Sequence, residues 1–197
     1  LTVAANDRMA LETELFRAMD SAAFEVHYQP KIDIGNSAVA GCEALVRWKR
    51  ADGMWIPPSV FIPLAEETGL VRRLDMYVLR KACRQQREWR EQGLGNVHMA
   101  VNMSGRSIIA ETFVDDVLDV LGREDVRPEH LGIEFGGMGA FAAWRQFHHR
   151  HDDLMFQPGL DDASAAVNEV LHVIERIKIS YGVDAVLFEE LRMQLDN

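Results

Sequence analysis

Short apolar segments with strand character alternate with longer helical segments along this chain, and this alternation restricts the fold more than any other feature of the sequence. Strands are predicted at residues 24–28, 38–48, 97–102, 131–135 and 176–179, with a marginal one at 154–156. Helices are predicted between them, at 8–22, just after 57–59, and at 71–92, 112–121, 140–149, 163–173 and 183–195. Strands that alternate with helices of this length form β/α units in a mainly parallel sheet.

These elements place the chain in the α/β class, and its roughly six predicted strands are too few for a complete (β/α) barrel. A complete eightfold barrel typically needs about 250 residues, whereas this sequence has 197. No internal repeat, low-complexity tract or flexible linker divides the sequence. We therefore expect a single domain over residues 1–197, with residues 1–7 as a linker or N-terminal tail.

The composition limits the classes of partner. A net charge of −10 at pH 7 argues against binding to a nucleic acid polymer, which needs a basic surface. The two cysteines, Cys42 and Cys83, lie in apolar runs and are expected to be buried thiols of a reducing compartment rather than a disulfide. No run of about 18 apolar residues and no signal-peptide pattern is present, so we expect a soluble, cytoplasmic protein without a membrane partner.

Acidic and amide residues recur at the ends of the predicted strands. In β/α barrels the reacting groups lie at the C-terminal ends of the strands, and the residues near those positions here are Glu43, Asn102, Glu134, the pair Asp161-Asp162, and Lys178. Carboxylate and amide oxygens are the ligands that Mg²⁺ and Mn²⁺ prefer. A metal pair bound in this way could lower the pKa of a bridging water and hold a phosphodiester for attack, while a nearby lysine offsets the phosphoryl charge.

Each of these residues also has an interpretation without function. A glutamate on a strand often faces solvent, Asn102 could cap the turn before Ser104, and an Asp-Asp pair before Ala163-Ser164 is typical of a helix N-terminus. A single lysine such as Lys178 carries little functional signal alone. The recurrence of such side chains on successive strand ends favours one common site over these separate explanations.

Five stretches of the sequence form a specific pattern. They are Val26-His27-Tyr28-Gln29-Pro30, Glu43-Ala44-Leu45-Val46-Arg47-Trp48, Phe61-Ile62-Pro63-Leu64-Ala65-Glu66-Glu67-Thr68-Gly69-Leu70, Val101-Asn102-Met103-Ser104 and Arg176-Ile177-Lys178-Ile179. Together they resemble the EAL domain, the bacterial module that binds and hydrolyses cyclic di-GMP. The resemblance runs from the first helix to Ile179 and is clearest over residues 24–106. It implies a TIM-like (β/α) barrel of the EAL type and a place in bacterial cyclic di-GMP signalling.

The resemblance also implies roles for individual residues. The metal ligands, which would hold Mg or Mn in an active enzyme, correspond to Glu43, Asn102, Glu134 and Asp161. Catalysis would involve Glu43, Asp162 at the second metal or the attacking water, and Lys178 beside the nucleophile. The dinucleotide would be held by Gln29, Pro30, Leu45 and Arg47.

The sequence departs from the family pattern at several positions. Glu134 is followed by Phe135-Gly136-Gly137, where the family has Thr and a second Glu, and the family's Lys-Ile-Asp reads Lys178-Ile179-Ser180. The Asp161-Asp162 pair runs into Ala163-Ser164-Ala165 instead of Phe-Gly-Thr-Gly, with a shorter spacing to Lys178. Segments that would carry a late-strand Glu and a guanine-contacting Gln are absent. The resemblance is therefore to a degenerate EAL domain that is incomplete at its C-terminus.

Three hypotheses for the function follow. The first is a catalytically impaired protein that acts by binding cyclic di-GMP, a protein partner, or a second copy of itself that covers the open strand edges of an incomplete barrel. Within it a protein partner is favoured over the dinucleotide, because the guanine-contacting segment is missing. The second is an active Mg- or Mn-dependent phosphodiesterase that hydrolyses cyclic di-GMP to linear pGpG. The third is a fragment or deletion form of a longer EAL protein.

Overall fold

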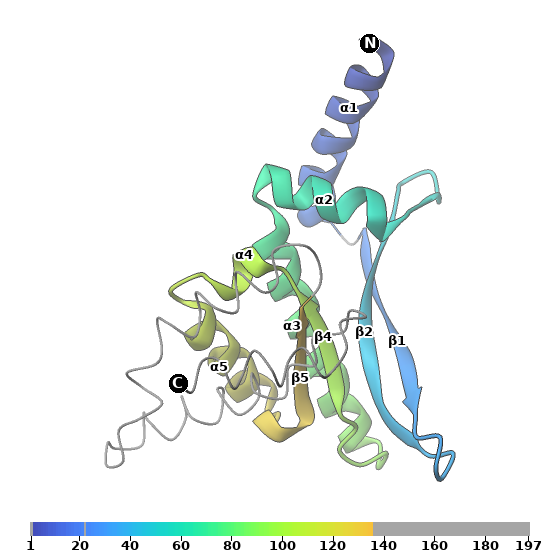
Figure 1. The fold of residues 1–197 in the computed structure, drawn as a ribbon, viewed down its shortest axis with the longest axis vertical. Helices are drawn as coiled ribbons and strands as arrows, with labels where there is room; N and C mark the ends of the chain where they lie inside the picture. The colour runs from blue at the N-terminus through green and yellow to red at the C-terminus, as the bar shows by residue number, and fades with distance from the viewer. Residues whose placement is uncertain (1, 22, 136–197) are drawn as a thin grey trace, which may run out of the picture.

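The structure of this chain, a computed structural model, describes residues 2–21 and 23–135. In chain order the elements are α1 (Thr2–Met19), β1 (Phe24–Ile32), β2 (Val39–Lys49), β3 (Trp55–Ile56), α2 (Pro58–Thr68), α3 (Val71–Glu91), β4 (Met99–Met103), α4 (Gly105–Ile108), α5 (Phe113–Glu124), the short 3₁₀ helix η1 (Pro128–His130) and β5 (Leu131–Phe135). Figure 1 shows α1 projecting at one end, with α3 and α5 beside the strands.

The strands form one sheet with the order β1-β2-β4-β5, and β3 adds to β2. The β1–β2 pair is an antiparallel hairpin, and the β2–β4 and β4–β5 pairs are parallel. The connection from β2 to β4 contains α3, and the connection from β4 to β5 contains α5. These are the β/α units that the alternating sequence pattern predicts.

The predicted elements before residue 135 are confirmed with small shifts in their bounds. The helix α1 begins at Thr2, so residues 2–7, expected to be a linker or tail, extend this helix. Three short elements that the sequence pattern does not predict are β3, α4 and η1. The predicted helices at 140–149, 163–173 and 183–195 and the predicted strands at 154–156 and 176–179 lie outside the described residues.

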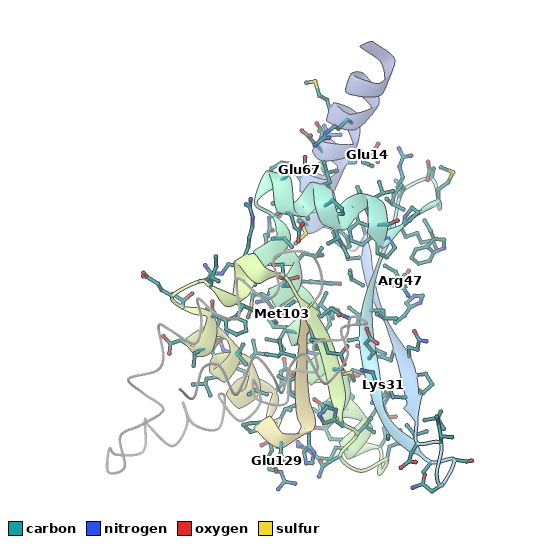
Figure 2. All side chains as sticks on the ribbon, viewed as in Figure 1. Glu14, Lys31, Arg47, Glu67, Met103 and Glu129 are labelled. Atoms are coloured by element: carbon teal, nitrogen blue, oxygen red, sulfur yellow. The ribbon has the colours of Figure 1, made fainter. Side chains whose placement is uncertain are left out.

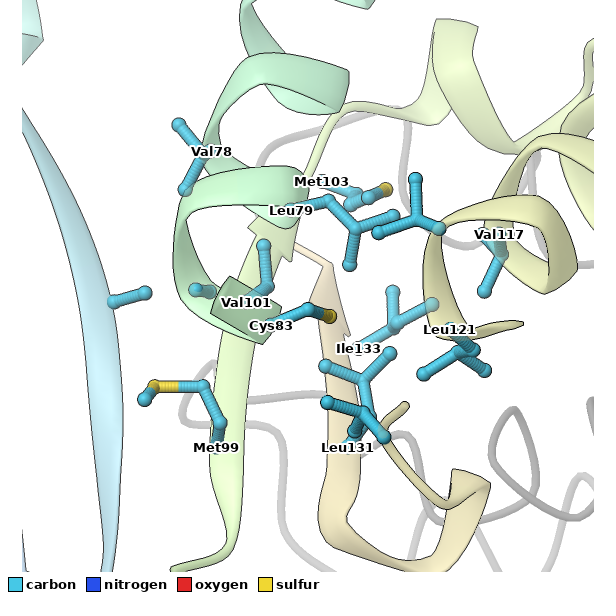
Figure 3. Packing of buried hydrophobic residues seen from close by; sticks show 14 of the residues in the cluster. Val78, Leu79, Cys83, Met99, Val101, Met103, Val117, Leu121, Leu131 and Ile133 are labelled. Atoms are coloured by element: carbon cyan, nitrogen blue, oxygen red, sulfur yellow. The ribbon is translucent and has the colours of Figure 1, made fainter. Parts of the chain in front are cut away.

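One face of the sheet is apolar because alternate strand residues point toward α3 and α5. Figure 3 shows side chains of both helices packed against the residues of β4 and β5. The strand residues of this cluster that are less than 4% exposed are Ala44, Met99, Val101, Met103, Leu131 and Ile133. The helices bury an apolar stripe against them, whose members include Leu79, Cys83, Val117 and Leu121. Because these residues are buried on the helix side, the alternate residues of each strand lie on the opposite face of the sheet.

A second apolar cluster joins α1 and α2 to the hairpin. Its centre is a group of aromatic rings from Phe24, Trp48 and Phe61, whose centroids lie 5.8–5.9 Å apart. Leu15 of α1 is fully buried in this cluster. Val46 is partly buried and packs against both clusters, so the two are continuous.

Both cysteines are free and buried, as expected from their apolar neighbours. Burial, together with the nearby Glu124 carboxylate, raises the pKa of Cys83 to about 12, so this thiol stays protonated at neutral pH. Among residues 2–21 and 23–135, no helix has the length and apolar character needed to cross a membrane.

Candidate functional site

The face of the sheet opposite the helices carries polar side chains, and the strand register brings several of them together. Gln29 of β1 is paired with Glu43 of β2, and Asn102 of β4 is paired with Glu134 of β5. Glu43 is paired with Ala100, two residues before Asn102, so Glu43 and Asn102 point to the same side. We call this surface the polar face, and its members are Gln29, Lys31, Glu43, Arg47, Asn102 and Glu134.

Direct contacts link four of these side chains. The Asn102 Nδ2 donates a hydrogen bond of 2.7 Å to Glu43 Oε1. The Lys31 Nζ donates to Glu134 Oε1 and lies 3.9 Å from Glu43 Oε2. Glu134 is buried, with 7% of its surface exposed, whereas the Glu43 side chain is 25% exposed. Three of the four predicted metal ligands, Glu43, Asn102 and Glu134, therefore lie in one cluster.

The ion pair between Lys31 and Glu134 also shows that the sheet is strongly curved. Lys31 lies on β1 and Glu134 on β5, and these strands are separated by β2 and β4. Neighbouring strands are about 4.8 Å apart, so a flat sheet would place β1 and β5 roughly 14 Å apart. Side chains rise from the face of a sheet rather than lie across it, so a contact over this separation indicates that the sheet bends toward the polar face, as in the interior of a barrel. The polar face is thus the concave side.

The oxygen atoms of Glu43, Asn102 and Glu134 are of the chemical type that binds a hard divalent cation. Two carboxylates and one amide oxygen are the ligand types that Mg²⁺ and Mn²⁺ bind. Within the described part of the chain, no group of three His, Cys, Asp or Glu side chains is placed to hold a metal ion. Of the predicted metal ligands, Glu43, Asn102 and Glu134 lie within the described residues. Asp161 and Asp162, the further carboxylates predicted to join them, lie outside the described residues, as does Lys178.

Asp75 of α3 fixes the turn that follows Asn102. Its Oδ2 accepts hydrogen bonds from Ser104 N at 2.9 Å, Ser104 Oγ at 2.7 Å and Ser107 Oγ at 2.6 Å. Burial raises the pKa of Asp75 above its ordinary value, although the bonds from Ser107 and Ser104 act in the opposite direction. Ser104 is the N-cap of α4, and its side chain accepts from Ser107 N. Asn102 is therefore free of the capping role and turns toward Glu43.

The predicted ligand-binding residues are divided between the two faces. Leu45 and Arg47 follow Glu43 at alternate positions on β2 and share its face. The Arg47 guanidinium donates to the Val46 carbonyl oxygen at 2.9 Å. Figure 2 shows Lys31 on β1 and Arg47 on β2. Pro30 is paired with Cys42, so it lies on the other side of the sheet from Gln29.

Two aromatic rings, those of His27 and Trp55, contact each other on the polar face. Trp48 is paired with both Phe24 of β1 and Ile56 of β3, so these strands flank β2 at this end. The Trp55 ring nevertheless lies 5.8 Å from the ring of His27 on β1, so the indole crosses β2 on the polar face. Trp55 is 46% exposed and has the Lys49 ammonium 5.3 Å from its ring.

Lys31 is the functional candidate that the sequence reasoning missed. The signal was present, because Lys31 follows Gln29 by two residues on the same strand and must share its face. His98 and Trp55 were also missed. A Cβ on Gly132 would lie 2.9 Å from His98 Cε1, so the imidazole lies against this glycine at the floor of the polar face.

Comparisons with known proteins agree on one family. The profile of the family described as "EAL domain" matches residues 12–178. The bifunctional diguanylate cyclase/cyclic di-GMP phosphodiesterase MucR of Pseudomonas aeruginosa is 37% identical over 130 residues, which are 66% of this chain and 19% of that protein. The cyclic di-GMP phosphodiesterase PdeR of Escherichia coli is 39% identical over 111 residues, 56% of this chain and 16% of that protein. The chain thus spans less than a fifth of the length of these two relatives.

Solved structures give the same result. The MucR phosphodiesterase in complex with c-di-GMP superimposes with a TM-score of 0.67 at 29% identity, covering 91% of this chain and 67% of that one. The FimX EAL domain of Xanthomonas citri in complex with c-diGMP gives a TM-score of 0.64 at 25% identity, covering 76% of this chain and 58% of that one.

Proposed function

The chain belongs to the EAL domain family, and from this premise we propose that it binds cyclic di-GMP on its polar face and has lost most or all of the family's hydrolytic activity. The observation that carries the proposal is the cluster of Glu43, Asn102 and Glu134 on the concave side of the sheet. Two solved relatives with this fold are complexes with c-di-GMP. No basic surface for a nucleic acid polymer is needed for a ligand of two nucleotides.

The polar face offers a suitable group for each part of a cyclic dinucleotide. The Arg47 guanidinium can pair with a phosphate through two parallel hydrogen bonds. Gln29 lies opposite Glu43 and offers an amide to the ribose or base. Leu45 and the half-exposed Trp55 provide apolar and aromatic surface on which a purine can stack. Mg²⁺ or Mn²⁺ held by Glu43, Asn102 and Glu134 would neutralise phosphate charge and make a water more acidic.

Impaired hydrolysis is supported by the sequence beyond the cluster. The family's second glutamate after the fourth-strand Glu is missing from Phe135-Gly136-Gly137, and its carboxylate after Lys-Ile is replaced by Ser180. Loss of one metal ligand or its supporting partner commonly costs 10–100-fold in metal affinity or activity. Several such losses act on the same reaction, so turnover falls much more than binding of the dinucleotide does.

Titration calorimetry with cyclic di-GMP, with and without Mn²⁺, tests the binding. We expect Arg47→Met to weaken binding at least about tenfold because a charged phosphate contact is lost. The control is Arg123→Met on α5, which removes the same charge from a side chain that is 75% exposed and pairs with Asp119. The proposal is wrong if the unaltered chain shows no heat of binding at any dinucleotide concentration tested.

A second candidate is an active phosphodiesterase, and the assembled Glu43–Asn102 pair favours it. In this reaction a water adds to phosphorus while the bond from phosphorus to the ribose 3′ oxygen breaks, which gives linear pGpG. Chromatographic detection of pGpG formed by the purified chain with Mn²⁺ decides between the two. Turnover that Glu43→Gln abolishes would establish the enzyme, and absence of product leaves the binding function.

A protein partner or a second copy of the chain is the third candidate. The end of the β1–β2 hairpin exposes three apolar side chains, Ile32 at 52%, Val39 at 61% and Ile34 at 95%. Exposed apolar side chains gathered at one place are typical of an interaction surface. Light scattering of the chain and of Ile34→Ser measures self-association. A dimer that the substitution dissociates would support this role, and a monomer in both cases would exclude self-association through the hairpin.

A further inference from the structure

The ammonium of Lys31 lies between the two carboxylates of the proposed metal site. It donates to Glu134 Oε1 and lies 3.9 Å from Glu43 Oε2, and Asn102 closes the group by its bond to Glu43. Lys31 comes from β1, whereas these three residues come from β2, β4 and β5. The lysine therefore enters the cluster from the hairpin, across the concave side of the sheet.

A divalent cation bound by the same ligands would need nearly the same place. Mg²⁺ lies about 2.1 Å from its oxygen ligands, and the ammonium already contacts an oxygen of Glu134 and lies close to one of Glu43. Two cations within about 4 Å repel each other strongly in a partly buried site. The ammonium and the metal ion cannot both occupy the space between the carboxylates.

We propose that Lys31 is an internal counter-cation that neutralises Glu43 and Glu134 in the metal-free chain and competes with Mg²⁺ or Mn²⁺ for their oxygens. The proposal rests on the metal-binding role given to these residues in the proposed function. The competition is electrostatic. The two carboxylates carry a charge of −2, and the ammonium of Lys31 reduces the net charge that attracts a divalent ion to −1. The Lys31 side chain is 42% exposed, so it can move into solvent when a metal ion displaces it.

The competition lowers the affinity for the metal, and removal of the charge reveals it. Lys31→Met keeps the length of the side chain and removes the ammonium. We expect its dissociation constant for Mn²⁺ to fall at least about tenfold, because the repulsion and the competing ion pairs are both gone. Lys31→Arg keeps the charge, and because a guanidinium pairs with carboxylates at least as well as an ammonium, this variant should bind Mn²⁺ no more tightly than the unaltered chain. Lys81→Met on α3 is the matched control, since Lys81 is exposed and packs over the Tyr77 ring away from the cluster.

The measurement is the binding of Mn²⁺ followed by electron paramagnetic resonance of the free ion, without dinucleotide. Equal or weaker binding by Lys31→Met would overturn the inference, because Lys31 would then only hold the ligands in place. Binding of Mn²⁺ by none of the variants would overturn it as well. Thermal unfolding of each variant with and without Mn²⁺ separates a folding defect from a change in affinity, since only the latter alters the shift that the metal produces.

Binding of cyclic di-GMP is measured separately on the same variants. Tighter Mn²⁺ binding by Lys31→Met with no dinucleotide binding by any variant would sustain the inference and refute the proposed ligand. Dinucleotide binding with unchanged Mn²⁺ affinity would do the reverse.

Discussion

The carboxylate of Asp75 accepts three hydrogen bonds from the segment that follows Asn102, although it belongs to a helix on the apolar side of the sheet. Such a group shapes the candidate site without touching a ligand. Its burial is costly for the ionised form, and the hydroxyl and amide donors of Ser104 and Ser107 offset this cost. The position of Asn102 thus depends on a buried acid 27 residues earlier in the sequence.

Asp75→Asn should change how stability depends on pH. Burial raises the pKa of Asp75 in the folded chain above 3.8, the value it has when exposed, so the folded state holds this proton more tightly. The stability from this group is complete below pH 3.8 and is lost as the pH rises through the folded pKa. The free energy of unfolding of the unaltered chain, relative to Asp75→Asn, should therefore fall with pH by about 1.4 kcal/mol for each unit of pKa shift. Urea unfolding of both proteins between pH 4 and 8 measures this difference, and a difference that grows with pH would contradict it.

The glycines at the floor of the polar face are expected to differ in their tolerance of a methyl group. A Cβ on Gly41 would lie 2.6 Å from the His98 carbonyl oxygen, which accepts a backbone hydrogen bond from Cys42 N and so cannot move freely. A Cβ on Gly132 meets the His98 ring, which can rotate away. Gly41→Ala should cost about 1–3 kcal/mol in the free energy of unfolding, and Gly132→Ala less. Urea unfolding checks the order, and a larger loss for Gly132→Ala would contradict it.

Much of the candidate site follows from period-two alternation. The prediction places Glu43, Asn102 and Glu134 together because the carboxyl ends of parallel strands meet at one edge of a sheet, and the structure confirms that they share a face. Lys31 was missed because its contact with Glu134 joins residues 103 positions apart in the sequence, which no local pattern reveals. The roles of these residues stay predictions.

Among the elements, α3 has the strongest influence on the sheet because it contacts both loops that lead into parallel strands. Gln86 is buried, and its Nε2 donates to the Val97 carbonyl at 2.6 Å and to the His130 carbonyl at 2.7 Å. Val97 lies just before β4, and His130 just before β5. One amide therefore sets where two neighbouring strands begin, and with them the register of Asn102 opposite Glu134.

Gln86→Ala should lower the free energy of unfolding by about 2–4 kcal/mol, because two buried carbonyls lose their donor and a buried side chain is removed. Gln85→Ala is the control, because Gln85 is next to Gln86 on the same helix and is only partly buried. This substitution should change the free energy of unfolding by less than about 0.5 kcal/mol. Denaturant unfolding of both variants gives the values. Equal effects of the two substitutions would show that the bonds of Gln86 contribute little.

The elements that the sequence did not predict share a physical property: they are short. A strand of two residues, such as β3, and a helix of four, such as α4, span only about one period of the pattern by which they would be recognised, so the pattern has no room to repeat. Both are held by their surroundings, β3 by pairing with β2 and α4 by the Ser104 cap and Asp75. Long elements such as α3 carry enough repeats to be predicted almost to the residue.

At the scale of the whole molecule, the described residues form the first part of a TIM-like (β/α) barrel of the EAL type, closed on its convex side by helices. The fold class was predictable because both the alternation of elements and the five motifs point to it. The interior was predictable only in part, because the charges that meet there come from strands far apart in the sequence. Residues 136–197 lie outside the described part of the chain.

The second apolar cluster makes α1 an integral part of this fold. Leu15 is fully buried against the aromatic group of Phe24, Trp48 and Phe61. Leu15→Ala should therefore cost about 2–5 kcal/mol. Met9→Ala, on the same helix at a position 66% exposed, should cost less than about 0.5 kcal/mol. Thermal unfolding of the two variants tests this, and a negligible effect of Leu15→Ala would mean that α1 contributes nothing to the stability of the barrel.

The division of each strand between an apolar and a polar side has an evolutionary consequence. Selection for a folded chain acts on the residues that pack under α3 and α5, whereas selection for chemistry acts on their alternate neighbours. Substitutions on the polar side can therefore accumulate with little effect on packing, except at positions such as Gly41 where an added methyl group meets the backbone. A lineage of such proteins can lose an enzymatic activity, or acquire a new ligand, while its architecture persists unchanged.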